Sequence, residues 1–170
     1  MVAPASPPHE VQATMVFGGD ALRWSGCFSP DGRMLAYISN ESGTAEAHVC
    51  RWEQGGPVGQ PLLASQNGAT YWLKWSHDGK RLYYQSTQNQ VVSVAISTAP
   101  RLSASAPEIA WDLDALAAAG DLGDGLIDLL PDGKLLVIQK GEGEDEITHY
   151  DVALNSFEML RAKMRKGSKG

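Results

Sequence analysis

Three stretches of the chain repeat one pattern of apolar and polar positions. In each, an apolar residue is followed three positions later by Asp-Gly, then by a basic residue and a run of apolar residues; the stretches are 28–39, 75–86 and 129–140. Asp-Gly between two apolar runs is typical of a tight hairpin turn, because glycine adopts positive φ without strain. The pattern therefore predicts structural turns at Asp31 and Gly32, at Asp78 and Gly79, and at Asp132 and Gly133.

The runs that follow these turns predict strands. They are apolar on both faces rather than alternating, which is typical of strands covered on both sides. The runs are 34–38, 82–84 and 135–138; further strands are expected at 47–51, 91–96 and 147–152, and weaker ones at 60–64 and 108–111. Phe28 and Trp75 occupy the same position of the repeat and are predicted to pack between neighbouring sheets.

Three antiparallel sheets of three or four strands must stack on one another to bury both faces. Radial stacking of such sheets is a β-propeller. The sequence therefore predicts an all-β fold of three antiparallel propeller blades, half of a six-bladed ring, with a short C-terminal helix. The expected boundaries are a lead-in with a possible closing strand at 1–23, blades at about 24–66, 67–111 and 112–156, and an amphipathic basic tail at 157–170. The closing strand is expected at 10–16, and the aspartate-rich start of the third blade, 112–128, is expected to be a polar connection.

The first repeat, Ser29-Pro30-Asp31-Gly32-Arg33-Met34-Leu35-Ala36-Tyr37-Ile38-Ser39 and on to Gly43, resembles the TolB-like (WD-like) β-propeller repeat. The same repeat occurs in propellers of prolyl-oligopeptidase-like enzymes. Residues 127–134 and 152–160 most resemble the C-terminal blades appended to bacterial serine/threonine protein kinases. The resemblance implies the propeller fold and says little about function, because its motif residues build turns.

Three blades are fewer than the ~4–8 that close a propeller ring. Three solutions remain open: two copies join about a two-fold axis, the chain is a fragment of a longer propeller, or its terminal segments cap the open ends. We favour the homodimer through the terminal blades, because two-fold symmetry is the commonest in oligomers.

Composition and charge exclude several function classes. With 43% hydrophobic and 20% charged residues, the 170-residue chain has the composition of a globular domain. Its net charge of −6 argues against a nucleic-acid partner. No window holds ~18 consecutive apolar residues, so no membrane span is expected. No signal peptide is visible, and the compartment stays unknown, although TolB-like family members are often periplasmic or extracytoplasmic.

No catalytic motif is visible in the chain, and we expect no enzyme activity and no cofactor. The Gly-x-Ser-x-Gly elbow, the P-loop and the kinase catalytic loop are all missing. The four histidines are scattered without metal-ligand spacing, so no metal site is expected. Cys27 and Cys50 fall on the first and third strands of one predicted sheet, too far apart for a disulfide, and should be free thiols.

Aromatic residues offer the strongest hint of a binding surface. Trp24 and Tyr71 stand four residues before the repeat positions, where the innermost strands begin, with Trp72 and Lys74 close by. Propellers bind partners around the channel mouth, so these four residues are the predicted ligand site, with inter-sheet packing as the competing interpretation. The predicted function is a non-catalytic module for protein or peptide binding; the alternative is a sensor or substrate-gating propeller of a kinase or prolyl-oligopeptidase-like enzyme whose catalytic domain is absent.

Overall fold

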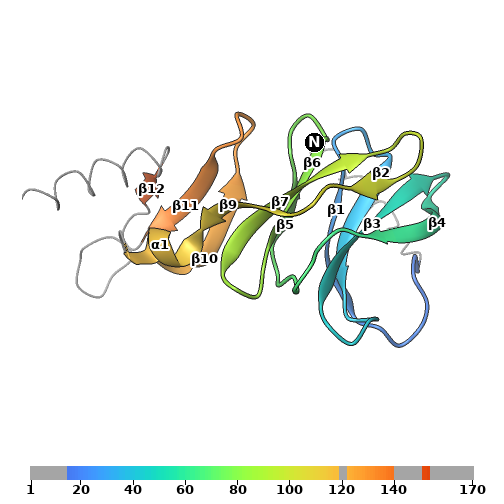
Figure 1. The fold of residues 1–170 in the computed structure, drawn as a ribbon, viewed down its shortest axis with the longest axis horizontal. Helices are drawn as coiled ribbons and strands as arrows, with labels where there is room; N and C mark the ends of the chain where they lie inside the picture. The colour runs from blue at the N-terminus through green and yellow to red at the C-terminus, as the bar shows by residue number, and fades with distance from the viewer. Residues whose placement is uncertain (1–14, 119–121, 140–150, 154–170) are drawn as a thin grey trace, which may run out of the picture.

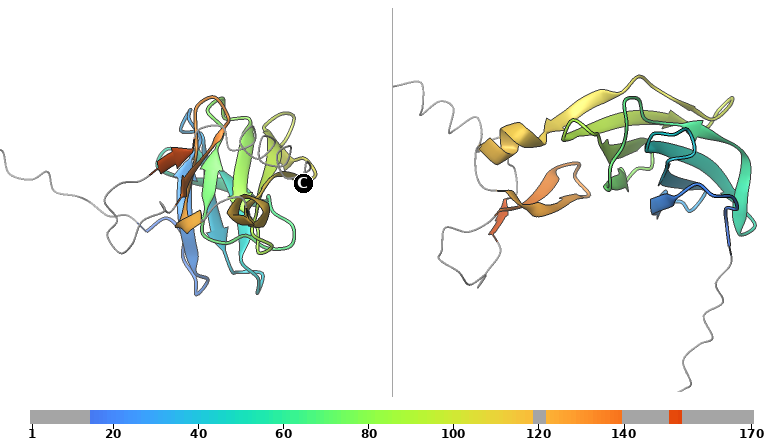
Figure 2. Two further views of the ribbon diagram at one scale, coloured as in Figure 1. Left: turned by 90° about the vertical axis from the view of Figure 1, so that its left-hand side faces the viewer. Right: turned by 90° about the horizontal axis from the view of Figure 1, so that it is seen from below.

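The computed structural model describes residues 15–118, 122–139 and 151–153. Within them the chain is all-β, with antiparallel sheets and a single six-residue helix. Figure 1 shows three sheets that follow one another along the longest axis of the molecule, in the order of the chain. The sheets do not close into a ring (Figure 2).

The first sheet is a meander whose strands pair in sequence order. It consists of β1 (Arg23–Phe28), β2 (Met34–Ser39), β3 (Glu46–Glu53) and β4 (Gly56–Leu63). The predicted weak strand at 60–64 is therefore longer and begins earlier. Cys27 lies on β1 and Cys50 on β3, two strands apart, and both are free thiols as expected.

The second sheet has five strands, more than the three or four expected. It consists of β5 (Leu73–Trp75), β6 (Arg81–Gln85), β7 (Gln90–Ser97), β8 (Ser103–Ala104) and β9 (Glu108–Asp112). The eight residues of β7 are long enough for two partners. Its end pairs with β8 through Ile96 and Ser97, and its beginning pairs with β9.

The third sheet is preceded by a helix that the sequence analysis did not predict. Helix α1 (Leu113–Ala118) begins where the Asp112 carboxylate accepts hydrogen bonds from the backbone N–H groups of Asp114 and Ala115, at 3.1 Å each. The sheet then consists of β10 (Leu122–Leu129), β11 (Leu135–Gln139) and β12 (Asp151–Ala153). The predicted strand at 147–152 reaches the described residues only at its end, and the expected C-terminal helix lies outside them. Most of the expected N-terminal strand also lies outside them; residues 15–22 are described and form no strand.

Two buried clusters join the sheets. The larger lies between the first and second sheets and contains Ile38, Val49, Leu82 and Tyr84, all 0% exposed. The smaller lies between the second and third sheets and includes Leu135 and other apolar side chains of β7, α1 and β11. Both faces of the second sheet are thus covered, as its apolar runs indicated.

The Asp-Gly repeats form three equivalent turns. In the first, the Asp31 carboxylate accepts hydrogen bonds from the Ser29 hydroxyl at 2.6 Å and the Arg33 N–H at 3.1 Å, and Gly32 has a φ of +70°. Asp78 with Gly79 and Asp132 with Gly133 repeat the carboxylate bond to the residue after glycine and the positive φ. The pKa of each turn carboxyl is lowered, chiefly by a side-chain hydrogen bond, from the Ser29 and Ser76 hydroxyls and the Lys134 ammonium, and next by the backbone N–H bond.

The prediction that Phe28 packs between sheets like Trp75 is wrong. Trp75 is 6% exposed in the larger cluster, whereas Phe28 is 50% exposed. The pairing register explains the difference. A β-bulge between Trp24 and Cys27 changes the alternation of β1, so that Trp24 and Cys27 pack on the larger cluster while Phe28 falls on the opposite face of the strand. There it meets Trp52 edge-on, with ring centroids 5.1 Å apart.

Candidate functional site

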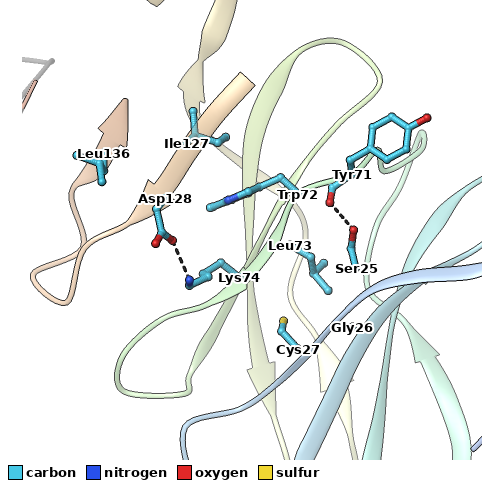
Figure 3. A pocket seen from close by; sticks show the side chains of 10 residues that line it. All are labelled: Ser25, Gly26, Cys27, Tyr71, Trp72, Leu73, Lys74, Ile127, Asp128 and Leu136. Carbon is cyan, nitrogen blue, oxygen red and sulfur yellow. Dashed lines mark hydrogen bonds and ion pairs between the residues drawn. The ribbon is translucent and has the colours of Figure 1, made fainter. Parts of the chain in front are cut away.

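A cleft of about 470 Å³ opens where the first strands of the three sheets converge. Its walls come from β1, from β5 and the two residues before it, from β10, and from Leu136 on β11. Figure 3 shows Trp72 and Lys74 in the middle of this cleft, with Asp128 opposite and Tyr71 at the edge. All three sheets are therefore needed to build it.

A local distortion of β1 shapes one wall. Ser25 has a φ of +52°, inside the bulge between Trp24 and Cys27. Its hydroxyl donates a hydrogen bond to the backbone carbonyl of Tyr71 (Figure 3). This bond ties the first sheet to the segment that enters the second sheet. The Tyr71 ring is left 82% exposed at the rim.

An ion pair crosses the cleft. The Lys74 ammonium lies 2.8 Å from Asp128 Oδ1, and both side chains are about half exposed. Partial burial is the largest single influence on Asp128 and opposes its ionisation. The hydrogen bonds from the Lys74 ammonium and the Leu129 N–H, together with the charge of Lys74, exceed it and lower the pKa of the carboxyl. The cleft thus presents one positive and one negative group side by side.

The remaining walls are mostly apolar. Trp72 is half-buried against the smaller cluster, with Ile127 beside it in that cluster. Cys27 lines the opposite side, and burial raises the pKa of its thiol to about 11, against the smaller opposing effect of Lys74. The thiol therefore stays protonated and acts as part of the apolar wall.

Three of the four predicted ligand-binding residues line this cleft: Tyr71, Trp72 and Lys74. The fourth, Trp24, does not. Its indole Nε1 donates a hydrogen bond to the Thr70 carbonyl at 3.0 Å, and its ring packs against the larger cluster. The Trp24 ring centroid lies 6.4 Å from that of Tyr71, so Trp24 packs against Tyr71 without lining the cleft.

The repeat pattern did not identify Ser25, Cys27 or Asp128 as lining residues. A signal for Asp128 was present: it stands one residue before the apolar position of the third repeat, as Lys74 does in the second. Both residues were therefore at equivalent points of neighbouring inner strands. Ser25 had no such signal, because the bulge that turns it toward Tyr71 depends on how β1 pairs with β2.

Neither a metal centre nor a membrane span emerges from the residues that the structure describes. Among them, no group of three or more His, Cys, Asp or Glu side chains is placed to hold a metal ion. No helix in the same residues has the length and apolar character to cross a membrane. His48 is buried and stacks on Tyr37 with ring centroids 5.5 Å apart.

Comparisons with known proteins add little to this geometry. No protein-family model matches the chain, and no curated protein matches it. Among solved structures, a crystal structure described as a "putative 6-phosphogluconolactonase" from Bacteroides uniformis matches with a TM-score of 0.44 and 18% identity. The match covers 75% of this chain and 38% of that one, so the chain spans well under half the length of this neighbour.

This match corrects one prediction. The sequence analysis expected no enzyme activity, whereas the similar structure is described as an enzyme. The expectation of a protein that is not an enzyme is therefore withdrawn. At this TM-score the likeness carries no activity over to the present chain.

Proposed function

We propose that the chain consists of three blades of a TolB-like β-propeller and that the cleft at their inner strands binds a protein or peptide ligand. Three features support the propeller: the meander order of the sheets, the three equivalent Asp-Gly turns, and the convergence of β1, β5 and β10 on one cleft. In a propeller the first strand of every blade lines the central channel, which is the place of this cleft.

The observation that carries the binding proposal is the aromatic pair at the cleft. Tyr71 is 82% exposed although it adjoins a cleft, and Trp72 beside it is half-buried. Tyrosine and tryptophan are enriched among the residues that dominate binding energy in protein interfaces. The Lys74–Asp128 pair adds a donor and an acceptor for the polar groups of a peptide backbone.

The test is selection of peptides from a random display library on the wild-type protein, followed by titration of the selected peptides. We expect Tyr71→Ala and Trp72→Ala to weaken binding at least tenfold, in the range of interface hot spots. The matched control is Leu22→Ala, which removes another large exposed apolar side chain, 66% exposed, outside the cleft. Peptides that bind the Tyr71 variant as well as the wild type, or a selection that yields no binder, would contradict the proposal.

We also propose that two copies associate through their end sheets to complete a six-bladed ring. The outer face of the first sheet supports this: the pairing register places Phe28 and Leu63 on the same face, where they are 50% and 53% exposed. Large exposed apolar patches are unusual on monomeric proteins.

The assembly proposal is tested by light scattering after size exclusion over a dilution series. A species of twice 18.3 kDa is expected for the wild type. Leu63→Glu should shift it to the monomer by placing a charge in the contact, while Tyr71→Ala should leave the mass unchanged. A wild-type monomer at all concentrations would refute the dimer and leave the peptide site to be judged separately.

A further inference from the structure

A second, smaller cavity lies away from the cleft, and none of its lining residues is shared with it. It has a volume of about 230 Å³ and opens between the loop that leaves the first sheet and the β7–β9 side of the second. Four carboxamide side chains line it: Gln66, Asn67, Gln88 and Gln90. None of the residues that line it carries a charge.

The four carboxamides are free to bind a ligand. Within the described part of the chain, the hydrogen bonds of Asn67, Gln88 and Gln90 outside the strands use only their backbone atoms. Gln66 likewise makes no side-chain hydrogen bond there. Each carboxamide offers two donors and an acceptor, so together they present a ring of neutral groups that can both give and accept hydrogen bonds.

The backbone that carries these amides is held in place. The Ser86 hydroxyl accepts hydrogen bonds from the N–H groups of Gln88 and Gln90, at 3.3 Å each. The Thr87 hydroxyl, on the same turn, donates a hydrogen bond at 2.9 Å to the carbonyl of Asn67 on the facing loop. The two halves of the polar ring are therefore connected to each other before any ligand binds, which lowers the entropic cost of binding.

The floor of the cavity is formed by apolar side chains. Val92 and Ile109 face each other across β7 and β9, and Ile109 is 63% exposed. Tyr84, paired with Val92, is 0% exposed, and its buried hydroxyl lies beside the backbone of Gln66. The floor therefore offers apolar surface to a ligand, and the hydrogen bonds must come from the carboxamides around it.

We propose that this cavity binds one ring of a neutral sugar. A pyranose carries hydroxyl groups around its rim for the carboxamides and an apolar C–H face for Ile109. The volume lies below the about 300–1,000 Å³ of pockets for drug-sized ligands, which fits a single ring. The absence of a lining cation excludes sugar phosphates and uronic acids from the expected ligands, because their charge would lose its hydration without compensation.

The experiment is an NMR titration of the ¹⁵N-labelled full chain, followed through the side-chain amide signals. The probes are methyl α-D-glucopyranoside, methyl α-D-galactopyranoside, methyl α-D-mannopyranoside and N-acetyl-D-glucosamine, with glucose 6-phosphate and glucuronate as charged comparisons. We expect saturable shifts of the Gln66, Asn67, Gln88 and Gln90 amide signals with at least one neutral sugar, at millimolar affinity, and none with the charged pair.

Variants assign the binding to this cavity. Gln90→Leu and Gln88→Leu should each weaken it about three- to tenfold, the loss expected for one or two hydrogen bonds. Ile109→Glu, at an exposed position that does not threaten the core, should abolish it. The matched control is Gln60→Leu, which removes an exposed carboxamide of β4 outside the cavity and should leave the affinity unchanged.

Three results would overturn the proposal. The first is that no neutral sugar shifts the amide signals at concentrations up to ~100 mM, well above a millimolar dissociation constant. The second is that the charged sugars cause equal shifts. The third is that binding persists in Ile109→Glu. A neutral peptide that shifts the same amides when sugars do not would assign the cavity to peptides instead. Tyr71→Ala should not affect the sugar titration, so this site and the peptide cleft are tested independently.

Discussion

The Lys74 ammonium lies 2.8 Å from Asp128 Oδ1 and joins β5 of the second sheet to β10 of the third. The two residues occupy equivalent positions in two copies of the repeat. Their side chains are 44% and 49% exposed, so water screens the attraction between them. The pair therefore orients the inner strands around the cleft more than it stabilises the fold.

The strength of this pair is measured by a double-mutant cycle. We expect Lys74→Ala and Asp128→Ala to show a coupling energy of about 0.2–1 kcal/mol in urea unfolding at low salt. Because salt screens exposed charges, the coupling should shrink in about 1 M NaCl. Lys80→Ala, at another exposed lysine, serves as the control for loss of a positive charge. A coupling well above this range that ignores salt would mean that the pair is shielded from water.

Gly68 connects the first two sheets at a point where no larger residue fits. Its φ is +94°, and a Cβ atom there would lie 2.7 Å from the Cγ2 atom of Thr87, whose hydroxyl is held by the Asn67 carbonyl. Gly43 has a similar φ of +89° but no atom within 4 Å of its Cβ position.

The pair of glycines separates backbone strain from steric conflict. Gly43→Ala should destabilise the protein by about 1 kcal/mol through its positive φ alone. Gly68→Ala should cost a further ~1–3 kcal/mol, because Thr87 must move. Urea unfolding of both variants gives the difference. Equal losses would show that Thr87 adjusts freely.

His48 should make the stability of the protein dependent on pH. Burial lowers the pKa of His48 in the fold, as does Arg23, while Glu41 and Glu46 oppose this to a smaller extent. In the unfolded chain the pKa is about 6.5, so below that pH the unfolded state binds more protons than the folded state. The stability is then complete above about pH 6.5 and decreases as the pH falls toward the lowered pKa of the folded state.

The variant that tests this is His48→Phe, which keeps a ring against Tyr37 but cannot be protonated. Urea midpoints between pH 7.5 and 5.5 should fall in the wild type and fall less in the variant. His77→Phe changes an exposed histidine in a turn and should retain the wild-type slope. If His48→Phe has the same slope as the wild type, the acid sensitivity arises elsewhere.

Cys27 and Cys50 should react slowly with thiol reagents in the native state. With a pKa of about 11, only about one Cys27 thiol in a thousand is ionised at pH 8. Burial also raises the pKa of Cys50, which is 0% exposed. Labelling with a disulfide reagent is expected to reach two thiols per chain quickly in urea and far more slowly without it. Fast native labelling that disappears in Cys27→Ser would show that the cleft wall opens.

Local chemistry explains what sequence analysis predicted well. Asp-Gly and an adjoining serine or leucine form a turn from contacts within six residues, so the three hairpins could be identified without knowledge of the rest of the fold. The strands beside the turns could also be identified from local sequence, because a run that is apolar on both faces indicates a strand covered on both sides.

Features that depend on pairing could not be predicted in this way. Strand β7 pairs with β9 along its first half and with β8 at its end, and nothing in the sequence of β7 itself specifies this division. The segment that forms helix α1 was expected to be a polar connection. Asp112, followed by the apolar residues Leu113 and Leu116, is nevertheless typical of a residue that caps the N-terminus of a helix.

The candidate site shows the same division. Tyr71 could be selected by its place in the repeat, with Trp72 and Lys74 close by, but Trp24 stands at the same place in its own repeat and is turned into the packing between sheets. Only the bulge in β1 decides this, and with it the exposure of Phe28. The alternation of a strand can be read from sequence only while the strand stays regular, because one extra residue exchanges its two faces.

Sequence by itself therefore determined the all-β class, the repeated turns and the approximate extent of the sheets, since these depend on contacts between near neighbours. The tertiary structure alone decided which aromatic side chains face the cleft and that Asp128 meets Lys74. It also decided that carboxamides from the loop after the first sheet and from the β6–β7 hairpin line one cavity. Those arrangements join residues far apart in the chain, and their geometry follows from strand register and sheet packing, which no local pattern specifies.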